Sequence, residues 1–409
     1  MPLRIEGKIL SGFETLDRGI TDIELVTGAG GPKLVTASGP EGGLASYSLR
    51  ADLLPVFGHN AFYVSSFVSG GGHDILVSNH GGETRVHVTG VTPDGLTSFR
   101  MNDNGSFSSR QTIDNARFGD GNAVAAETDS GLIVMADPEG SGFAIYDIRQ
   151  DWALVNDRKV EDTGNTNADR IGDIETVRIG SSDIIVVASQ SEHGVTAYRM
   201  VDGEAVAMDS VGRPEGLGIM VPTDIEIVEA GGNTYLIVAS EPSGGNSGAL
   251  TVMRIRANGT LEPTDHVIDT LDSRFGDVQH ISTATVDGHT YVVAAGGDGG
   301  LTLFELLPNG QLVHLESLEG TAEMPLGNVT ALEIAVVGNE LQIFVATEAD
   351  AGISVLSYDY RGRGDVLIAE EGGDYIIGTG QADVIVDGSG RDKLRGGGGA
   401  DLFVLTADD

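Results

Sequence analysis

Short apolar segments, each followed by a turn of glycine, proline or acidic residues, recur seven times along the chain. The segments occupy residues 33–38, 74–79, 132–137, 184–189, 235–240, 291–296 and 342–347. After each turn the chain alternates apolar and polar residues, as in 44–49 and 195–200. Alternation with period two is typical of β-strands. The pattern therefore predicts seven copies of one β unit.

Each unit has further strands on both sides. An apolar strand such as 22–26, 224–228 or 330–335 precedes the pair, and a weaker one such as 311–315 follows it. Four strands at intervals of roughly 40 to 60 residues indicate a blade of a β-propeller. We predict an all-β fold with seven blades, in which an N-terminal strand near residues 8–17 completes the last one. A pair of β-sandwiches, the alternative, explains seven matching units less well. Residues 8–361 loosely resemble lactonase-like and YVTN-type propellers.

The pattern changes abruptly after residue 361. Four aspartates lie nine residues apart: Asp374, Asp383, Asp392 and Asp401. Glycines precede them, and an apolar residue follows each at a fixed distance: Ile376, Ile385, Leu394 and Phe403. A flexible glycine-rich linker has no physical reason to repeat an acid and an apolar residue in phase. The segment therefore predicts a stacked, repetitive structure with the four apolar residues pointing inward.

The segment 372–409 resembles the hemolysin-type, or RTX, nonapeptide repeat, a parallel β-roll unit that binds Ca²⁺. The resemblance implies that carboxylate and backbone carbonyl oxygens converge on calcium, which takes six to eight oxygen ligands. The implied metal residues are Asp374, Gly378, Gly380, Asp383, Asp387, Gly388, Gly390, Asp392, Gly396, Gly397, Gly399 and Asp401. Thr379, Gln381 and Asp387 stand where the repeat has glycine. We therefore expect a weaker site in the first full coil.

Charge and composition limit the classes of molecule that the protein can bind. The formal net charge of −37 excludes nucleic acid as a favourable partner and favours cations, basic ligands or neutral molecules. The chain has no cysteine, so disulfides and thiolate chemistry are excluded. No apolar stretch is long enough to span a membrane, and the first residues do not form a cleavable export signal.

The RTX resemblance implies where the protein works. Such repeats fold outside the cell after type I export, which uses an uncleaved C-terminal signal, and this accounts for the missing N-terminal signal. We therefore expect a secreted, extracellular protein. Because the chain stops soon after the last repeat, without the longer tail of such proteins, we expect a truncated roll. The predicted organisation is a propeller over 1–361, a linker over 362–371 and a calcium-binding roll over 372–409.

Acidic residues also recur at predicted starts of innermost strands. They are Asp22, Asp120, Asp173, Asp224 and Asp277, with Asn60 and Asn328 in the other two blades. The turns between second and third strands carry further acids, so one mouth of the channel is predicted to be strongly negative. Converging carboxylates there are candidates for a divalent cation site. The favoured interpretation is plainer: Asp and Asn are good turn residues, and the repeated Arg-x-Gly-Asp phrase forms local ion pairs.

Two functions remain open at this stage. One is a secreted calcium-binding propeller that acts as a binding or surface-interaction module for an extracellular ligand. The other is an extracellular metal-dependent hydrolase, lactonase-like or phosphoester-cleaving, with a small-molecule substrate over the channel. The sequence assigns no catalytic residue, since it has no nucleophile elbow or phosphate-binding loop in a usable context.

Overall fold

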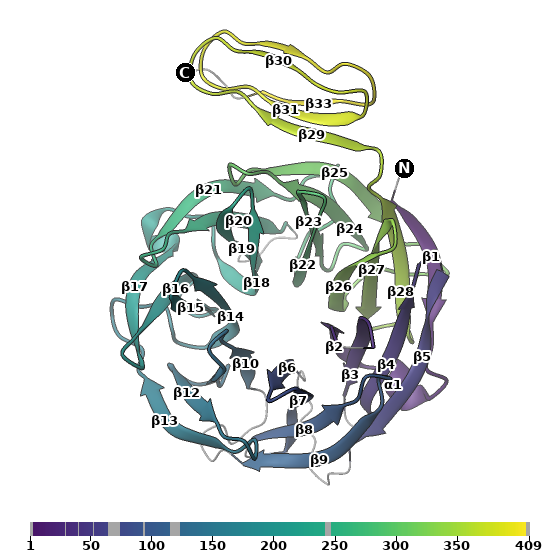
Figure 1. Cartoon of the computed structure of the whole chain (residues 1–409), viewed down its shortest axis with the longest axis vertical. Coiled ribbons are helices and arrows are strands. Elements are labelled where there is room, and N and C mark those ends of the chain that lie inside the picture. Colours follow the sequence, from purple (N-terminus) through teal and green to yellow (C-terminus); the bar gives the residue numbers. More distant parts are fainter. Residues whose placement is uncertain are drawn as a thin grey trace.

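A computed structural model describes residues 3–28, 30–39, 41–51, 53–63, 74–92, 95–114, 123–241 and 247–405. It contains seven four-stranded antiparallel sheets arranged around a central axis, which confirms the predicted seven-bladed β-propeller (Figure 1). Helix in the described residues is confined to α1 (Glu14–Asp17) and the single 3-10 turn η1 (Arg213–Glu215). No helix in this part of the chain has the length and apolar character needed to cross a membrane.

The blades follow one another along the chain, each running from the channel outward. Blade one contains β2 (Ile20–Val26), β3 (Lys33–Ser38), β4 (Gly43–Arg50) and β5 (Leu53–Phe62). Blade two contains β6 (Ile75–His80), β7 (Glu83–Thr92), β8 (Gly95–Met101) and β9 (Phe107–Asp114). Blade three contains β10 (Val124–Glu127), β11 (Leu132–Ala136), β12 (Phe143–Ile148) and β13 (Leu154–Val160). Blade four contains β14 (Ile171–Ile179), β15 (Ser182–Ser189), β16 (Gly194–Val201) and β17 (Glu204–Gly212).

The last three blades bring the chain back to its start. Blade five contains β18 (Val221–Ala230), β19 (Asn233–Glu241), β20 (Ala249–Ile255) and β21 (Leu261–Ile268). Blade six contains β22 (His280–Val286), β23 (His289–Ala295), β24 (Gly300–Leu306) and β25 (Leu312–Glu319). Blade seven combines β26 (Val329–Val337), β27 (Glu340–Thr347) and β28 (Ile353–Asp359) with the N-terminal β1 (Arg4–Ile9). Because β1 pairs antiparallel with β28, the first and last parts of the propeller are joined and an exposed sheet edge is avoided.

Glycine recurs near the start of the third strand because the outermost strand passes very close there. A Cβ on Gly43 would collide with the carbonyl oxygen of Ala61, and one on Gly300 with that of Leu318. The same collision occurs in blade seven, between Gly352 and the carbonyl oxygen of Ile9 on β1. In these three blades the turn signal after the second strand marks a position at which two backbones meet.

The core is divided among the gaps between neighbouring blades. One cluster, for example, joins Ile237 and Leu250 of blade five to Ile281 and Phe304 of blade six. Such clusters explain why the second and third strands are almost uninterrupted apolar runs, since both faces of each blade are covered.

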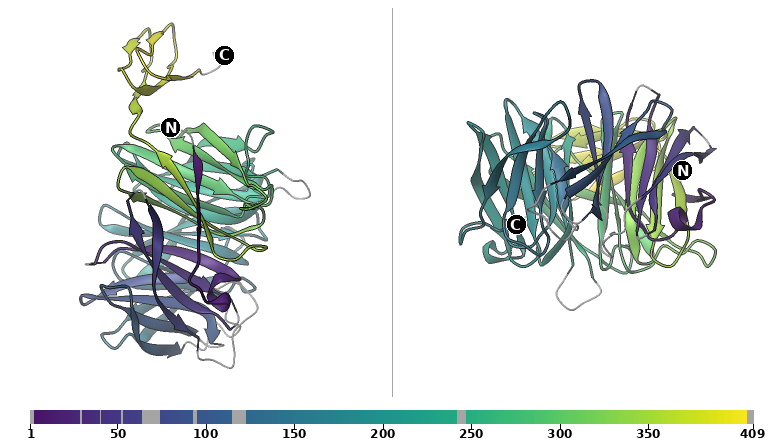
Figure 2. Two further views of the ribbon diagram at one scale, coloured as in Figure 1. Left: turned by 90° about the vertical axis from the view of Figure 1, so that its right-hand side faces the viewer. Right: turned by 90° about the horizontal axis from the view of Figure 1, so that it is seen from below.

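Beyond blade seven the chain forms two small parallel sheets at the rim of the ring (Figures 1 and 2). One contains β29 (Arg363–Ile368), β31 (Ala382–Val386) and β33 (Leu402–Val404), and the other β30 (Tyr375–Ile377) and β32 (Lys393–Arg395). Residues 362–371, expected to be a linker, therefore contain the first strand of this structure. We call residues 363–405 the tail.

The tail core is thinner than the repeat pattern predicts. Ile385 is fully buried, whereas Ile376 and Leu394 are half-buried. Phe403, which was also expected to point inward, is 42% exposed. It lies in β33, the last strand of the described residues.

Candidate functional site

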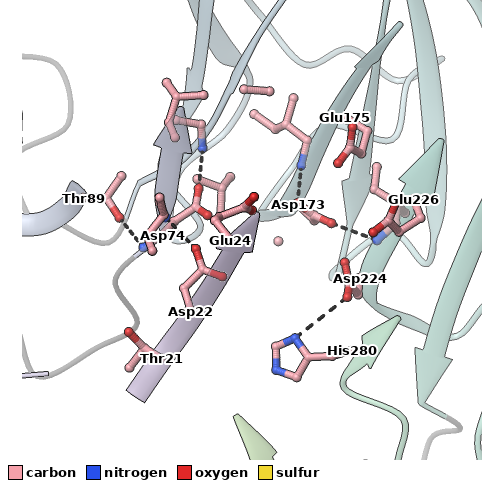
Figure 3. A pocket seen from close by; sticks show the side chains of 18 of the residues that line it. Thr21, Asp22, Glu24, Asp74, Thr89, Asp173, Glu175, Asp224, Glu226 and His280 are labelled. Carbon is pink, nitrogen blue, oxygen red and sulfur yellow. Dashed lines mark hydrogen bonds and ion pairs between the residues drawn. The ribbon is translucent and has the colours of Figure 1, made fainter. Parts of the chain in front are cut away.

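The innermost strands of the propeller surround a cavity of about 690 Å³ on the central axis (Figure 3). Its wall is built by alternate residues of these strands, because side chains with period two share one face. Carboxylates form two levels. Asp22, Asp74, Asp173 and Asp224 lie near the start of the innermost strands and form what we call the upper level. Glu24, Glu175, Glu226 and Glu333 lie further along these strands and form the lower level. We call these eight residues the channel carboxylates; Glu127 of β10 also lines the cavity.

The upper aspartates connect neighbouring blades. One carboxylate oxygen of Asp22 accepts the backbone N–H of Ile75 in blade two at 2.6 Å. Asp173 accepts from Ile225 of blade five at 2.8 Å, and its other oxygen accepts from Ile174 at 2.7 Å. The remaining pairs follow the same rule: Asp74 with Ala125 at 3.0 Å and Asp224 with Ile281 at 2.8 Å. Each aspartate thus ties the innermost strand of its own blade to the next.

Burial and crowding raise the pKa values of the carboxyl groups in this cavity. Burial, the largest cause, raises the pKa of Asp22 to about 7, and it raises the pKa of Glu175 and Glu333 to about 8. Burial, followed by repulsion from neighbouring carboxylates, also raises the pKa of Glu24, Asp74, Asp224 and Glu226. At neutral pH the channel carboxylates therefore share protons.

Among the described residues that line the cavity, His280 is the one basic side chain. Its Nδ1 lies 3.8 Å from Asp224, as the dashed line in Figure 3 shows. Burial nevertheless lowers the pKa of His280 to about 4. An imidazole that stays neutral at pH 7 does not balance the carboxylates.

The predicted channel residues have different outcomes. Asp22, Asp173 and Asp224 line the cavity, whereas Asp120 lies outside the described residues. Asp277 does not line the cavity. It lies in the turn before β22 with a φ of 50°, and His280 takes the inward position instead.

The two asparagines of the predicted series do not lie at the channel mouth in the same way. Asn60 lies on β5, the outermost strand of blade one, so its predicted place at an inner strand is wrong. The side-chain amide of Asn328 donates a hydrogen bond to the carboxylate of Glu348, one of the turn acids, at 3.2 Å.

Asp74 and the four lower glutamates were not predicted to face the channel. Segment 74–79 was expected to be a second strand, but β6 is the innermost strand of blade two. The glutamates carried a usable signal. Three blades repeat the phrase Asp-Ile-Glu, at 22–24, 173–175 and 224–226, which places both acids of each phrase on one face of a strand.

The two described copies of the Arg-x-Gly-Asp phrase do not form the expected local pairs, and the third copy, 117–120, lies outside the described residues. Arg170 contacts Glu139 of blade three at 3.1 Å, and Arg274 contacts Glu319 at 3.8 Å. Neither contacts the aspartate of its own phrase. Within the described residues no group of three His, Asp or Glu side chains is placed to hold a metal ion. The upper aspartates of the channel are instead occupied as acceptors for backbone N–H groups.

The tail brings its aspartates together in two rows. In the first row the N–H of Asp365 donates to Asp383 at 2.7 Å, and the N–H of Asp383 donates to Asp401 at 3.2 Å. In the second row the N–H of Asp374 donates to Asp392 at 2.8 Å. Residues 18 positions apart are therefore direct neighbours in adjacent coils. Asp365 continues the nine-residue phase one step before Asp374, and this signal was missed because the segment was assigned to the linker.

Backbone groups of each turn close around the same carboxylates. Asp383 accepts from the N–H of Thr379 at 2.7 Å, and Asp392 from the N–H of Gly388 at 3.2 Å. The hydroxyl of Thr379 also donates to Asp383 at 2.9 Å. Although burial opposes it, these hydrogen bonds and that of Asp365 hold the pKa of Asp383 below its usual value. The carboxylate of Asp383 is therefore both buried and ionised at neutral pH.

The glycines of the tail leave room for converging oxygens. A Cβ on Gly396 would collide with the carboxylate of Asp401, and one on Gly378 with both Asp383 and the carbonyl oxygen of Gly396. Gly390 and Gly397 adopt φ of 127° and 99° beside the carbonyl oxygens of Gly372 and Thr379. Gly399 and Gly388 are similarly crowded, whereas a Cβ on Gly380 would meet nothing within 4 Å. A set of carboxylate and carbonyl oxygens fits calcium chemistry.

Comparison with known proteins gives only weak structural likenesses. No family model matches the sequence, and no curated protein does either. A periplasmic gluconolactonase of Pseudomonas aeruginosa superposes with a TM-score of 0.46 at 14% identity, over 82% of this chain and 95% of that one. A protein of Lactobacillus plantarum superposes with a TM-score of 0.46 at 12% identity, over 81% of this chain and 96% of that one. At these values the likeness carries no argument for a shared activity.

Proposed function

We propose that this is a calcium-binding β-propeller protein that works outside the cell, with the tail as its calcium-binding element and the propeller as a binding module. The observation that carries the proposal is the stacking of Asp365, Asp383 and Asp401 in one row, and of Asp374 and Asp392 in a second. Rows of carboxylates one coil apart, with crowded glycine turns beside them, place carboxylate and carbonyl oxygens close together, which is the ligand set that calcium prefers.

Charge explains why a cation belongs in these rows. Successive carboxylates one coil apart repel each other, and the net charge of −37 adds to the repulsion. A bound calcium ion supplies positive charge between coils and coordinates the oxygens of both. Calcium is favoured over magnesium because it accepts a larger and less regular set of oxygen ligands.

The expected weakness of the first full coil has a structural counterpart. The hydroxyl of Thr379 approaches both oxygens of Asp383, at 2.9 and 3.1 Å. The corresponding Gly397 of the next coil has no side chain to do so. We therefore infer that calcium binds more tightly beside Asp401 than beside Asp383.

The propeller is assigned a binding role because its channel offers charge without catalytic geometry. The upper aspartates are used to join blades, and His280 is neutral near pH 7. The raised pKa values of Glu175 and Glu333 would suit a general acid, but the described residues contain no group of three side chains to hold the metal that the hydrolase alternative requires. A neutral or cationic extracellular ligand suits the acidic propeller. Calcium sites of extracellular proteins have dissociation constants of about 10⁻⁴ to 10⁻³ M, and a secreted protein would meet calcium at such concentrations.

Native mass spectrometry of the full chain in the presence of Ca²⁺ tests the proposal. We expect calcium adducts that Mg²⁺ at the same concentration does not replace. Asp401→Ala should lose adducts, whereas Asp224→Asn in the channel should retain all of them. Equal adduct numbers in the wild type and Asp401→Ala, with a loss in Asp224→Asn, would move the calcium site from the tail to the channel and overturn the proposal.

A further inference from the structure

A buried ionic contact joins the tail to blade six. Glu305 of β24 has a side chain that is only 1% exposed, and it carries a charge that needs partners. His289 of β23 contacts one of its oxygens at 2.6 Å. The other oxygen pairs with the guanidinium of Arg363, whose side chain is 12% exposed. Arg363 is the first residue of β29, so the tail supplies the strong cationic partner of a propeller glutamate.

The same strand reaches a proposed calcium ligand within two residues. The N–H of Asp365 donates to the carboxylate of Asp383 at 2.7 Å. Between them, Gly364 faces Asp383 so closely that a Cβ would collide with its oxygen. Residues 363–365 thus connect Glu305 of blade six directly to the first row of tail aspartates.

Apolar side chains complete the contact. Leu307 and Val313 of blade six form one buried cluster with Val384 and Val386 of β31. Four more tail side chains pack against this cluster at its margin: Val366, Ile368, Leu402 and Val404. Figure 1 shows the tail at the rim of the ring, with β29 next to β25. The tail is therefore docked on the propeller rather than tethered to it.

We propose that the tail is a calcium-dependent clamp on blade six, so that calcium bound in the tail protects β24 and β25 of the propeller from opening. The proposal rests on the proposed function, because it requires calcium in the tail. Without calcium the rows of carboxylates repel and β31 separates from β29. Val384 and Val386 then leave Leu307 and Val313 exposed, and Arg363 loses the strand that holds it against Glu305. Ligand binding that needs the docked state stabilises that state by mass action.

The clamp gives the propeller a regional response to calcium. In the described residues, Arg363 of the tail pairs with Glu305 of blade six and lies near Tyr358 of blade seven. Blade three has no residue in the shared cluster. A calcium effect that passes through the docked surface should therefore be strong in β24 and β25 and weak in β11 and β12.

Hydrogen exchange of the full chain, with and without Ca²⁺, tests this clamp. With calcium at about 100 times its dissociation constant, we expect exchange in peptides covering 300–319 to slow by about tenfold or more. Peptides covering 132–148 should change by less than about twofold. Calorimetry on the same sample establishes whether calcium is bound.

Two variants locate the coupling. Val313→Ala removes apolar contact on the propeller side, and Glu305→Gln removes the buried charge; neither touches a proposed calcium ligand. Both should bind calcium as the wild type does while losing most of the protection in 300–319. If the wild type binds calcium and exchange in 300–319 does not change, the clamp is overturned and the calcium function stands. If no calcium binds, both are overturned.

Discussion

The carboxylate of Asp383 accepts a hydrogen bond from the backbone N–H of Asp365, the residue 18 positions earlier in the chain. That distance is two nonapeptides, so one turn of the coil brings equivalent positions into contact. The same step relates Asp374 to Asp392 and Asp383 to Asp401. The repeat in the sequence is thereby converted into rows of oxygen ligands, and the predictions for the tail depend on this register.

The tail glycines should differ in importance. Gly390 has φ of 127° and lies against the carbonyl oxygen of Gly372, so Gly390→Ala is strained and displaces an oxygen. We expect it to weaken calcium binding by roughly tenfold or more, corresponding to about 1–3 kcal/mol of backbone strain. Gly362→Ala is the matched control, since Gly362 is not among the implied calcium residues and a Cβ there meets nothing within 4 Å. Its calcium affinity, measured by titration calorimetry, should stay within about twofold of the wild type. Equal losses in the two variants would contradict the geometry.

Removing an inter-blade acceptor should destabilise the ring. Asp173→Ala leaves the N–H groups of Ile225 and Ile174 without their acceptor, which we expect to cost about 1–3 kcal/mol of unfolding free energy. Asp277→Ala, at the equivalent phrase of blade six, removes no such bridge and should cost less than about 0.5 kcal/mol. Denaturant unfolding at constant calcium compares the two. A larger loss in Asp277→Ala would show that the assignment of bridging residues is wrong.

The channel carboxylates should make the propeller less stable as the pH rises. Their folded pKa values, about 7 for Asp22 and about 8 for Glu175, exceed the unfolded values near 4. A carboxyl of this kind contributes its full stability below the unfolded pKa and loses it as the pH rises through the folded pKa. Glu175→Gln keeps the side chain neutral, so we expect it to gain stability over the wild type between pH 5 and pH 9, by on the order of 1 kcal/mol.

The control for that pH profile is Glu204→Gln on the outermost strand of blade four, where Glu204 is exposed. Thermal unfolding at several pH values, with calcium held constant, provides the comparison. Glu204→Gln should follow the wild type at every pH. If the stability of Glu175→Gln changes with pH in the same way as that of the wild type, burial does not raise the pKa of Glu175.

His87 should make the propeller less stable at acid pH, whereas the channel carboxylates make it less stable as the pH rises. Its side chain is buried between blades two and three, 5.8 Å from the ring of Trp152, and neither ring nitrogen has a hydrogen-bond partner. Burial lowers its pKa to about 3. Because the unfolded histidine binds a proton near pH 6.5, this site loses stability as the pH falls from about 6.5 toward 3.

Replacing that histidine by an apolar residue should therefore help. We expect His87→Leu to stabilise the chain by about 1 kcal/mol at pH 7 and by more at pH 5, because no buried nitrogen is left without a partner. His59→Leu, in the half-buried outermost strand of blade one, should show no such growth toward acid pH. Unfolding curves at pH 7 and pH 5 decide the matter, and a destabilised His87→Leu at pH 5 would refute it.

The ring could be predicted because it is repeated in the sequence, whereas the channel depended on details that a repeat does not fix. Seven apolar pairs were enough to count the blades. Asp277 failed as a channel residue because β22 begins three residues later, at His280, and the inward phase moved with it. Asp74 was missed because the short β6 resembles a second strand in its apolar pattern. When an innermost strand is assigned as a second strand, its residues are placed inside the blade and no longer at the channel.

The tail shows the same limit in another form. Phase and composition located four of its aspartates, since a period of nine is visible without structure. The partnership of Arg363 with Glu305 joins residues 58 positions apart and has no local signal. Docking of the tail on blade six also depends on the packing of Val384 and Val386 against another blade, which only the three-dimensional arrangement reveals.

Titration calorimetry of the full chain with Ca²⁺, compared with a variant that carries both Asp383→Ala and Asp401→Ala, tests the central claim most directly. The wild type should bind calcium with a measurable heat, and the double variant should lose binding in the first row while keeping its folded propeller. Identical titration curves for the two proteins would contradict the assignment of calcium to the tail.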